Sequence, residues 1–173
     1  MRFDRASRQI MAALDRSEIR MSLYLFALLI GVVAGLRAMT APAAVAWGAH
    51  LGLISLQGTP LAWLGGNIAT WTFTALAVLE LVADQLPKTP SRKVPVQFGT
   101  RIVSGAFCGA AIGMTLNAWV GGAVAGAIGA VIGTLAGADV RGRLARAFGK
   151  DLPAGLLEDV VAVGGAALIV SAL

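Results

Sequence analysis

The side chains that could do chemistry in this chain are carboxylates and guanidiniums placed at the edges of apolar segments. Glu80 and Asp84 end one apolar run, and Arg101 lies near the start of the next. A separation of four residues puts Glu80 and Asp84 on one face of a helix. Charged groups at membrane depth are costly unless they are paired or used, so these three residues are a candidate site.

Further acids lie at the ends of the later apolar segments, at Asp139, Glu158 and Asp159. We expect all five acids and Arg101 to converge near the cytoplasmic face of the membrane. Arg37 lies far along the first apolar segment, so it is expected in the outer half of the bilayer. Because like charges disfavour joint ionisation, neighbouring carboxylates favour binding a proton or a cation.

The composition indicates an integral membrane protein. Of 173 residues, 57% are hydrophobic and only 13% are charged, and the mean hydropathy is +0.78. A soluble domain carries roughly 25% charged residues. The net charge of +5 comes from clusters that flank the apolar runs, so it does not indicate nucleic-acid binding. The only cysteine, Cys108, excludes a disulfide within one chain, and we expect no cofactor.

The apolar segments predict an all-α bundle of about five transmembrane helices. A spanning helix needs ~20 mostly apolar residues. The candidate spans are about 21–38, 61–84, 102–118, 119–138 and 153–173. They form one predicted domain, 21–173, preceded by residues 1–20, which predict either an amphipathic interfacial segment or a partly disordered basic tail. Pro42 is expected to end the first span. Residues 43–56 are too few to cross again and predict a re-entrant or interfacial helix on the outer side, with Trp47 and His50 near headgroup level.

The basic residues outside the spans predict the orientation. They form three clusters, in residues 2–20, 88–93 and 141–150. Five spans would place all three clusters on one side of the membrane. The positive-inside rule then predicts a multi-pass protein with a cytoplasmic N-terminus.

Glycine spacing predicts close packing between helices. Gly105, Gly109 and Gly113 recur every four residues in the third span, and the fourth span carries a similar series. Such GxxxG-type faces allow a tight antiparallel hairpin, and an unused face would allow a homodimer. Residues 31–37 and 133–139 resemble each other, which suggests an inverted repeat of the kind found in transporters.

Several stretches resemble a family of small bacterial inner-membrane proteins catalogued only as a domain of unknown function. They read GLRAMTAPAAVAW (35–47), ELVADQLPKTPSR (80–92), RIVSGAFCGAAIG (101–113) and LLEDVVAVGGAALIV (156–170). The resemblance implies a polytopic helical bundle. It implies no activity and no catalytic residues.

The charged residues leave three functional hypotheses. In the first, a small transporter or permease-like protein binds a cation or proton through the five acids, with Arg101 and Arg37. In the second, the protein is structural or lipid-binding and its charges are paired for folding. In the third, acids near the interface hold a divalent metal for lipid-phosphate chemistry. The third is the weakest, because the spaced aspartate or histidine signatures of such enzymes are absent from the sequence.

Overall fold

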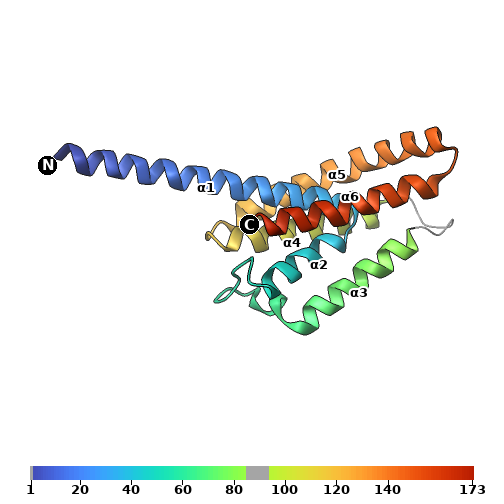
Figure 1. The fold of residues 1–173 in the computed structure, drawn as a ribbon, viewed down its shortest axis with the longest axis horizontal. Helices are drawn as coiled ribbons and strands as arrows, with labels where there is room; N and C mark the ends of the chain where they lie inside the picture. Colours follow the sequence, from blue (N-terminus) through green and yellow to red (C-terminus); the bar gives the residue numbers. More distant parts are fainter. Residues whose placement is uncertain (1, 85–93) are drawn as a thin grey trace.

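The computed structural model describes the backbone of residues 2–84 and 94–173, with the side chains of residues 17–84 and 94–173. Lys88, Arg92 and Lys93 of the predicted basic loop lie outside this part of the chain. The described residues form helices and no strands (Figure 1). The elements are α1 (Arg2–Leu36), α2 (Thr40–His50), the short 3-10 helix η1 (Ala62–Gly65), α3 (Asn67–Ala83), α4 (Pro95–Met114), α5 (Trp119–Phe148) and α6 (Asp151–Ser171).

Helix α5 is central to the bundle and contacts α1, α4 and α6. It packs antiparallel to α4, so that Gly105 faces Gly126 and Gly113 faces Ala118. Helices α4 and α5 are thus the tight hairpin that the glycine spacing predicts. Lipid offers no hydrophobic drive for helices to associate, so close contact between backbones supplies the packing energy instead.

Helices α1 and α5 run in the same direction. Gly31 of α1 faces Gly126 of α5, and Gly35 faces Ala130 further along both helices. An inverted repeat would require segments 31–37 and 133–139 to run in opposite directions. The predicted inversion is therefore wrong for these two segments, which lie on parallel neighbouring helices (Figure 1).

The first span ends at Leu36, and the chain turns back at residues 37–39 into α2. The sequence predicted a re-entrant or interfacial helix here, and the burial of helix α2 within the bundle excludes the interfacial alternative. Helix α2 starts beside the charged residues and returns through the bundle, until Gly48 meets Val170 near the end of α6. Most of α2 is buried, including Pro42, Val45 and Ala46. Eleven residues suffice for this return because protein surrounds α2 rather than lipid.

The return of α2 changes the predicted topology. The N-terminal end of α1 and the connection between α5 and α6 lie at opposite ends of the bundle (Figure 1). The basic clusters 2–20 and 141–150 therefore cannot share one side of a membrane that α1 crosses, and that premise of the predicted orientation is wrong. Helix α1 also continues without a break through the expected boundary near residue 20.

Within the described part of the chain, three helical segments are long and apolar enough to cross a membrane: Ser17–Leu36, Trp119–Phe148 and Asp151–Ser171. Helix α3 is apolar but has only 17 residues, because η1 occupies the start of the predicted second span. Helix α5 continues beyond the predicted end at 138. Its apolar part, from Trp119 to Asp139, is ~30 Å long at 1.5 Å per residue, which matches the hydrocarbon core of a bilayer.

The glycine contacts make a direct prediction for stability. A Cβ atom added at Gly105 would lie 2.6 Å from the carbonyl oxygen of Gly126. Gly105→Ala should therefore lower the free energy of unfolding by about 1–3 kcal/mol, because one helix must move away from the other. Thermal unfolding in detergent measures this effect. Gly164→Ala is the matched control, since no atom lies within 4 Å of its added Cβ. Equal stability of the two variants would contradict the packing described here.

Candidate functional site

The candidate site is built around the break between α1 and α2. A helix end leaves backbone carbonyl or N–H groups without partners inside the helix. Here the end of α1 and the start of α2 are both enclosed by other helices. Neither Met39 nor any neighbouring side chain of α2 caps its start. Glu80 of α3 takes this role: its Oε1 accepts a hydrogen bond from the Ala38 N–H at 2.7 Å, and its Oε2 accepts one from the Met39 N–H at 2.8 Å.

Arg101 of α4 satisfies the other side of the break. Its Nη1 donates to the carbonyl oxygens of Gly35 at 2.8 Å and Leu36 at 2.5 Å. The charges match the helix dipoles, with a carboxylate at the start of α2 and a guanidinium at the end of α1. Arg101 also lies 3.8 Å from Glu80. The two residues therefore bind the same turn and each other.

Two hydroxyl groups complete this contact with the broken segment. Ser104 Oγ donates to the Ala38 carbonyl oxygen at 2.5 Å, and Thr134 Oγ1 donates to that of Gly35 at 3.2 Å. Both side chains are buried. The irregular backbone at residues 37–39 is thus held from α3, α4 and α5. Non-helical backbone at membrane depth is tolerated where protein surrounds it in this way.

Arg37 lies within the break itself and has no exposed side-chain surface. It forms ion pairs with Asp84 of α3 and with Asp159 of α6, the latter at 2.5 Å. Two carboxylates therefore share one buried guanidinium. Among the described side chains, Arg37 Nε and Thr40 Oγ1 are buried without a hydrogen-bond partner. Buried polar groups are normally satisfied, so these atoms could bind a small polar ligand or water.

A second group of charges surrounds Arg141 of α5. Its guanidinium contacts Asp151 at 2.6 Å and Glu158 at 3.4 Å. Its Nη2 also lies 3.4 Å from the Asp84 carbonyl oxygen, which connects this group to the end of α3. Asp151 is largely exposed, whereas Glu158 is buried. The Arg141 group is therefore a continuation of the site toward the end of the bundle.

The structure brings together most of the predicted site residues, with two differences. Glu80, Asp84, Arg101 and Asp159 converge as expected. Arg37, placed by the sequence in the opposite half of the bilayer, lies among them. The predicted separation was wrong because α2 returns through the bundle, so that α3 ends beside the break rather than at the opposite end.

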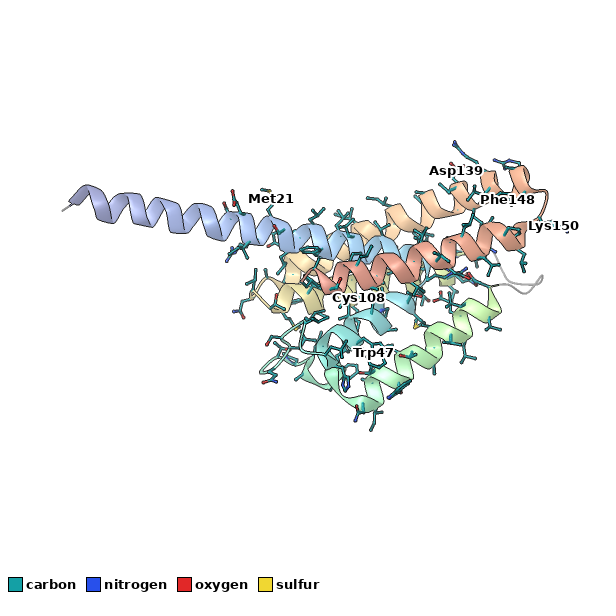
Figure 2. The ribbon with its side chains drawn as sticks, viewed as in Figure 1. Met21, Trp47, Cys108, Asp139, Phe148 and Lys150 are labelled. Carbon is teal, nitrogen blue, oxygen red and sulfur yellow. The ribbon has the colours of Figure 1, made fainter. Side chains whose placement is uncertain are left out.

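Glu158 lies beside this convergence, whereas Asp139 does not join it. Asp139 is exposed and pairs with Arg143 of its own helix at 2.8 Å. It lies on the outer side of α5, away from α3 (Figure 2). The role of the converging residues in binding stays a prediction.

Sequence reasoning missed Ser104, Thr134 and Arg141. Ser104 lies one helical turn after Arg101, so the spacing could have placed both on one face. Thr134 follows Ala130 by four residues on the face of α5 that packs against α1, where it is the one polar side chain among small residues. Arg141 was counted only as a flanking basic residue. Nothing in its spacing indicates that α6 brings two acids to it.

Helix α3 carries two of the acids but has little apolar packing near them. It packs mainly on α2 and η1. In its first half, Trp47 Nε1 donates to Thr74 Oγ1 at 3.0 Å, and Phe73 lies 6.5 Å from both Trp63 and Phe107 between ring centroids. At its end, Glu80 and Asp84 supply the contacts with Arg101 and Arg37. Charged groups therefore attach the end of α3, and aromatic rings attach its first half.

The contacts of Glu80 predict a structural effect that can be separated from surface charge. Glu80→Ala should lower the free energy of unfolding by about 2–4 kcal/mol, because two buried N–H groups and Arg101 lose their partner. Glu80→Gln should cost about 1–2 kcal/mol, since it keeps the shape and loses the charge. Chemical unfolding in detergent measures both effects. Asp139→Asn is the control, and its exposed ion pair should contribute only about 0–1 kcal/mol. A Glu80→Ala variant as stable as Asp139→Asn would rule out the capping role.

Comparisons with known proteins identify a family and add no activity. No curated protein and no solved structure matches the chain. A family model described as a domain of unknown function, DUF4126, matches residues 24–172. The match includes the helix break and every charged residue of the site. The chain therefore belongs to the DUF4126 family.

Proposed function

We propose that this protein is a small cation- or proton-linked transporter of the bacterial inner membrane, with its site around Arg37. The observation that supports this most directly is that Asp84 and Asp159 share one fully buried guanidinium. Two carboxylates that lie together away from water disfavour joint ionisation, which favours binding a proton or a small cation. Asp84 and Asp159 are the proposed binding residues, whereas Glu80 and Arg101 hold the break in place.

The broken helix supports the same proposal. Secondary transporters commonly build ion and substrate sites from discontinuous helices, whose free ends contribute backbone groups and dipoles. In this chain the end of α1 and the start of α2 meet beside Arg37. Thr40 Oγ1 and Arg37 Nε add a buried acceptor and a buried donor at the same turn. A cation would bind the carboxylates and the hydroxyl oxygen of Thr40, beside Arg37.

Helix α3 would be the moving part. It carries Asp84 and is joined to the α1–α4–α5 core near the site by ion pairs and hydrogen bonds rather than by a packed apolar face. Neutralising Asp84 would weaken its pair with Arg37 and let the end of α3 separate from the core. The aromatic contacts at the start of α3 would remain as the pivot. Helices α3 and α4 would cross the membrane together with α1, α5 and α6.

The site would lie toward the cytoplasm in this proposal. By sequence, residues 88–93, between α3 and α4, and residues 141–150, at the α5–α6 connection, contain seven basic residues, and residues 2–20 contain five. The positive-inside rule therefore favours a cytoplasmic site. Since the two ends are opposed, a cytoplasmic site implies an N-terminus on the outer side of the membrane.

Flux measurements would test the transport proposal. Reconstituted vesicles should show wild-type flux of protons or of a monovalent cation under an imposed gradient, measured with an entrapped indicator dye. Asp159→Asn and Asp84→Asn should each reduce this flux at least about tenfold, equivalent to ~1.4 kcal/mol or more at the site. Asp139→Asn should retain full flux, because Asp139 lies apart from the site.

The outcomes separate transport from a purely structural role. Absence of flux from folded wild-type protein, across a panel of pH gradients and alkali cations, would end the transport proposal. Retained flux in a folded Asp159→Asn variant would show that the transport site does not lie at Arg37. The structural alternative has its own support, since Glu80 and Arg101 bind backbone groups of the break. It would then be the preferred function.

Cysteine labelling would test the topology. Cys108 is buried, so it should give little background with a membrane-impermeant thiol reagent. In intact cells Ser17→Cys should be labelled, and Lys150→Cys should be protected until the membrane is opened. Labelling of both positions from the same side would show that α1 does not cross as described. The reverse pattern would leave the fold intact and place the site at the outer face.

A further inference from the structure

Within the described part of the chain, two buried polar atoms at the break have neither a hydrogen-bond partner nor an ion-pair partner. They are Arg37 Nε and Thr40 Oγ1. Arg37 is 0% exposed and Thr40 is 5% exposed. The two residues lie on either side of the turn at 38–39 that leads into α2. Buried polar groups are normally hydrogen-bonded to protein or to an ordered ligand, so the turn is a candidate site for a small ligand.

The chemistry of the guanidinium restricts what this ligand can be. Arginine only donates hydrogen bonds, so the partner of Arg37 Nε must carry a lone pair of electrons. A metal cation binds the lone pairs of oxygen ligands and offers none of its own. It would also be repelled by the positive charge of Arg37. The Thr40 hydroxyl can donate or accept, so it is compatible with any acceptor that Arg37 binds.

The charges around the break favour a neutral acceptor over an anion. They come from four helices: Glu80 and Asp84 of α3, Arg101 of α4, Arg141 of α5, and Glu158 and Asp159 of α6. An anion bound at Arg37 would lie close to the carboxylates of Asp84 and Asp159, where little water screens their repulsion. A neutral acceptor meets no such repulsion. Water is the smallest one, and a buried water typically makes about three hydrogen bonds.

We propose that Arg37 and Thr40 hold a water molecule beside the two carboxylates. The ion that Asp84 and Asp159 bind is then a proton and not a metal cation. A proton that arrives on this water passes to a carboxylate oxygen: one O–H bond of the hydronium breaks, the carboxyl O–H bond forms, and a neutral water remains. The assignment of the ion rests on the proposed transport function, because it selects one of the two ions that this function allows. The bound water does not depend on transport.

Thermal unfolding in detergent would test the bound water. Thr40→Val keeps the branched shape of the side chain and removes the hydroxyl. If that hydroxyl has no ligand, its removal should leave the unfolding midpoint unchanged or raise it. If it holds a water with Arg37, the midpoint should fall by about 2–4 °C, because the water and Arg37 Nε lose a partner.

Two further variants control this measurement. Thr40→Ser keeps a hydroxyl, so its midpoint should lie closer to wild type than that of Thr40→Val. Thr72→Val is the matched control, since Thr72 is exposed on α3. A Thr40→Val midpoint that is not lower than those of wild type and Thr72→Val would overturn the bound water.

Reconstituted vesicles with an entrapped pH-sensitive dye would test the ion. Proton flux through wild-type protein should be unchanged when sodium in the buffer is replaced by potassium or by choline. Thr40→Val should reduce this flux about tenfold, the equivalent of one lost hydrogen bond, whereas Thr40→Ser and Thr72→Val should retain it.

The outcomes separate this inference from the proposed function. Flux that requires a metal cation would overturn the proton assignment and leave transport standing. Undiminished proton flux in a folded Thr40→Val variant would show that the water at Thr40 does not carry the proton. Absence of any flux would end both the transport proposal and the ion assignment, whereas the unfolding measurement would still decide whether the water is bound.

Discussion

The organisation of this protein depends on satisfying the backbone where α1 stops and α2 begins. Carbonyl and N–H groups enclosed by other helices have no access to bulk water, and leaving each one unpaired costs several kcal/mol. Three different helices supply the partners, through Glu80, Arg101 and Thr134. The positions of α3, α4 and α5 around the break are thereby fixed to one another. Charged side chains, which are costly in lipid, therefore determine how the helices of this bundle are arranged.

Close glycine packing and the polar contacts at the break determine different features of the same bundle. The glycine faces bring α1, α4 and α5 near enough for Arg101 to reach the end of α1. Bulkier residues at Gly35 or Gly105 would separate the helices and leave the guanidinium short of its acceptors. The polar network in turn fixes the depth at which the helices align. Neither the apolar contacts nor the ion pairs alone would define this arrangement.

The sequence predicts the local features of this fold better than its path. Four-residue glycine spacing predicts the α4–α5 hairpin, and Pro42 predicts the end of the first span, because both depend on short-range geometry. The spacing of Glu80 and Asp84 likewise predicts that they share a face. The length of residues 43–56 predicts that the segment does not cross lipid, but it does not separate a re-entrant helix from an interfacial one, because only the neighbouring helices decide whether protein surrounds α2. The return of α2 brings Arg37 to the acids of α3. Asp139 stays apart because the rotation of α5 about its axis also depends on its neighbours.

The separation of aromatic and charged residues has a spectroscopic consequence. The four tryptophans, Trp47, Trp63, Trp71 and Trp119, lie in the half of the bundle where α3 and α5 begin, away from the break (Figure 2 labels Trp47). Trp47 lies against Trp71 at 5.6 Å between ring centroids, close enough for their emission to be coupled. Intrinsic fluorescence therefore observes the pivot end of α3 and is insensitive to local changes around Arg37. A fluorescence change on acidification or ligand addition would mean that an event at the charged end had been transmitted along the length of α3.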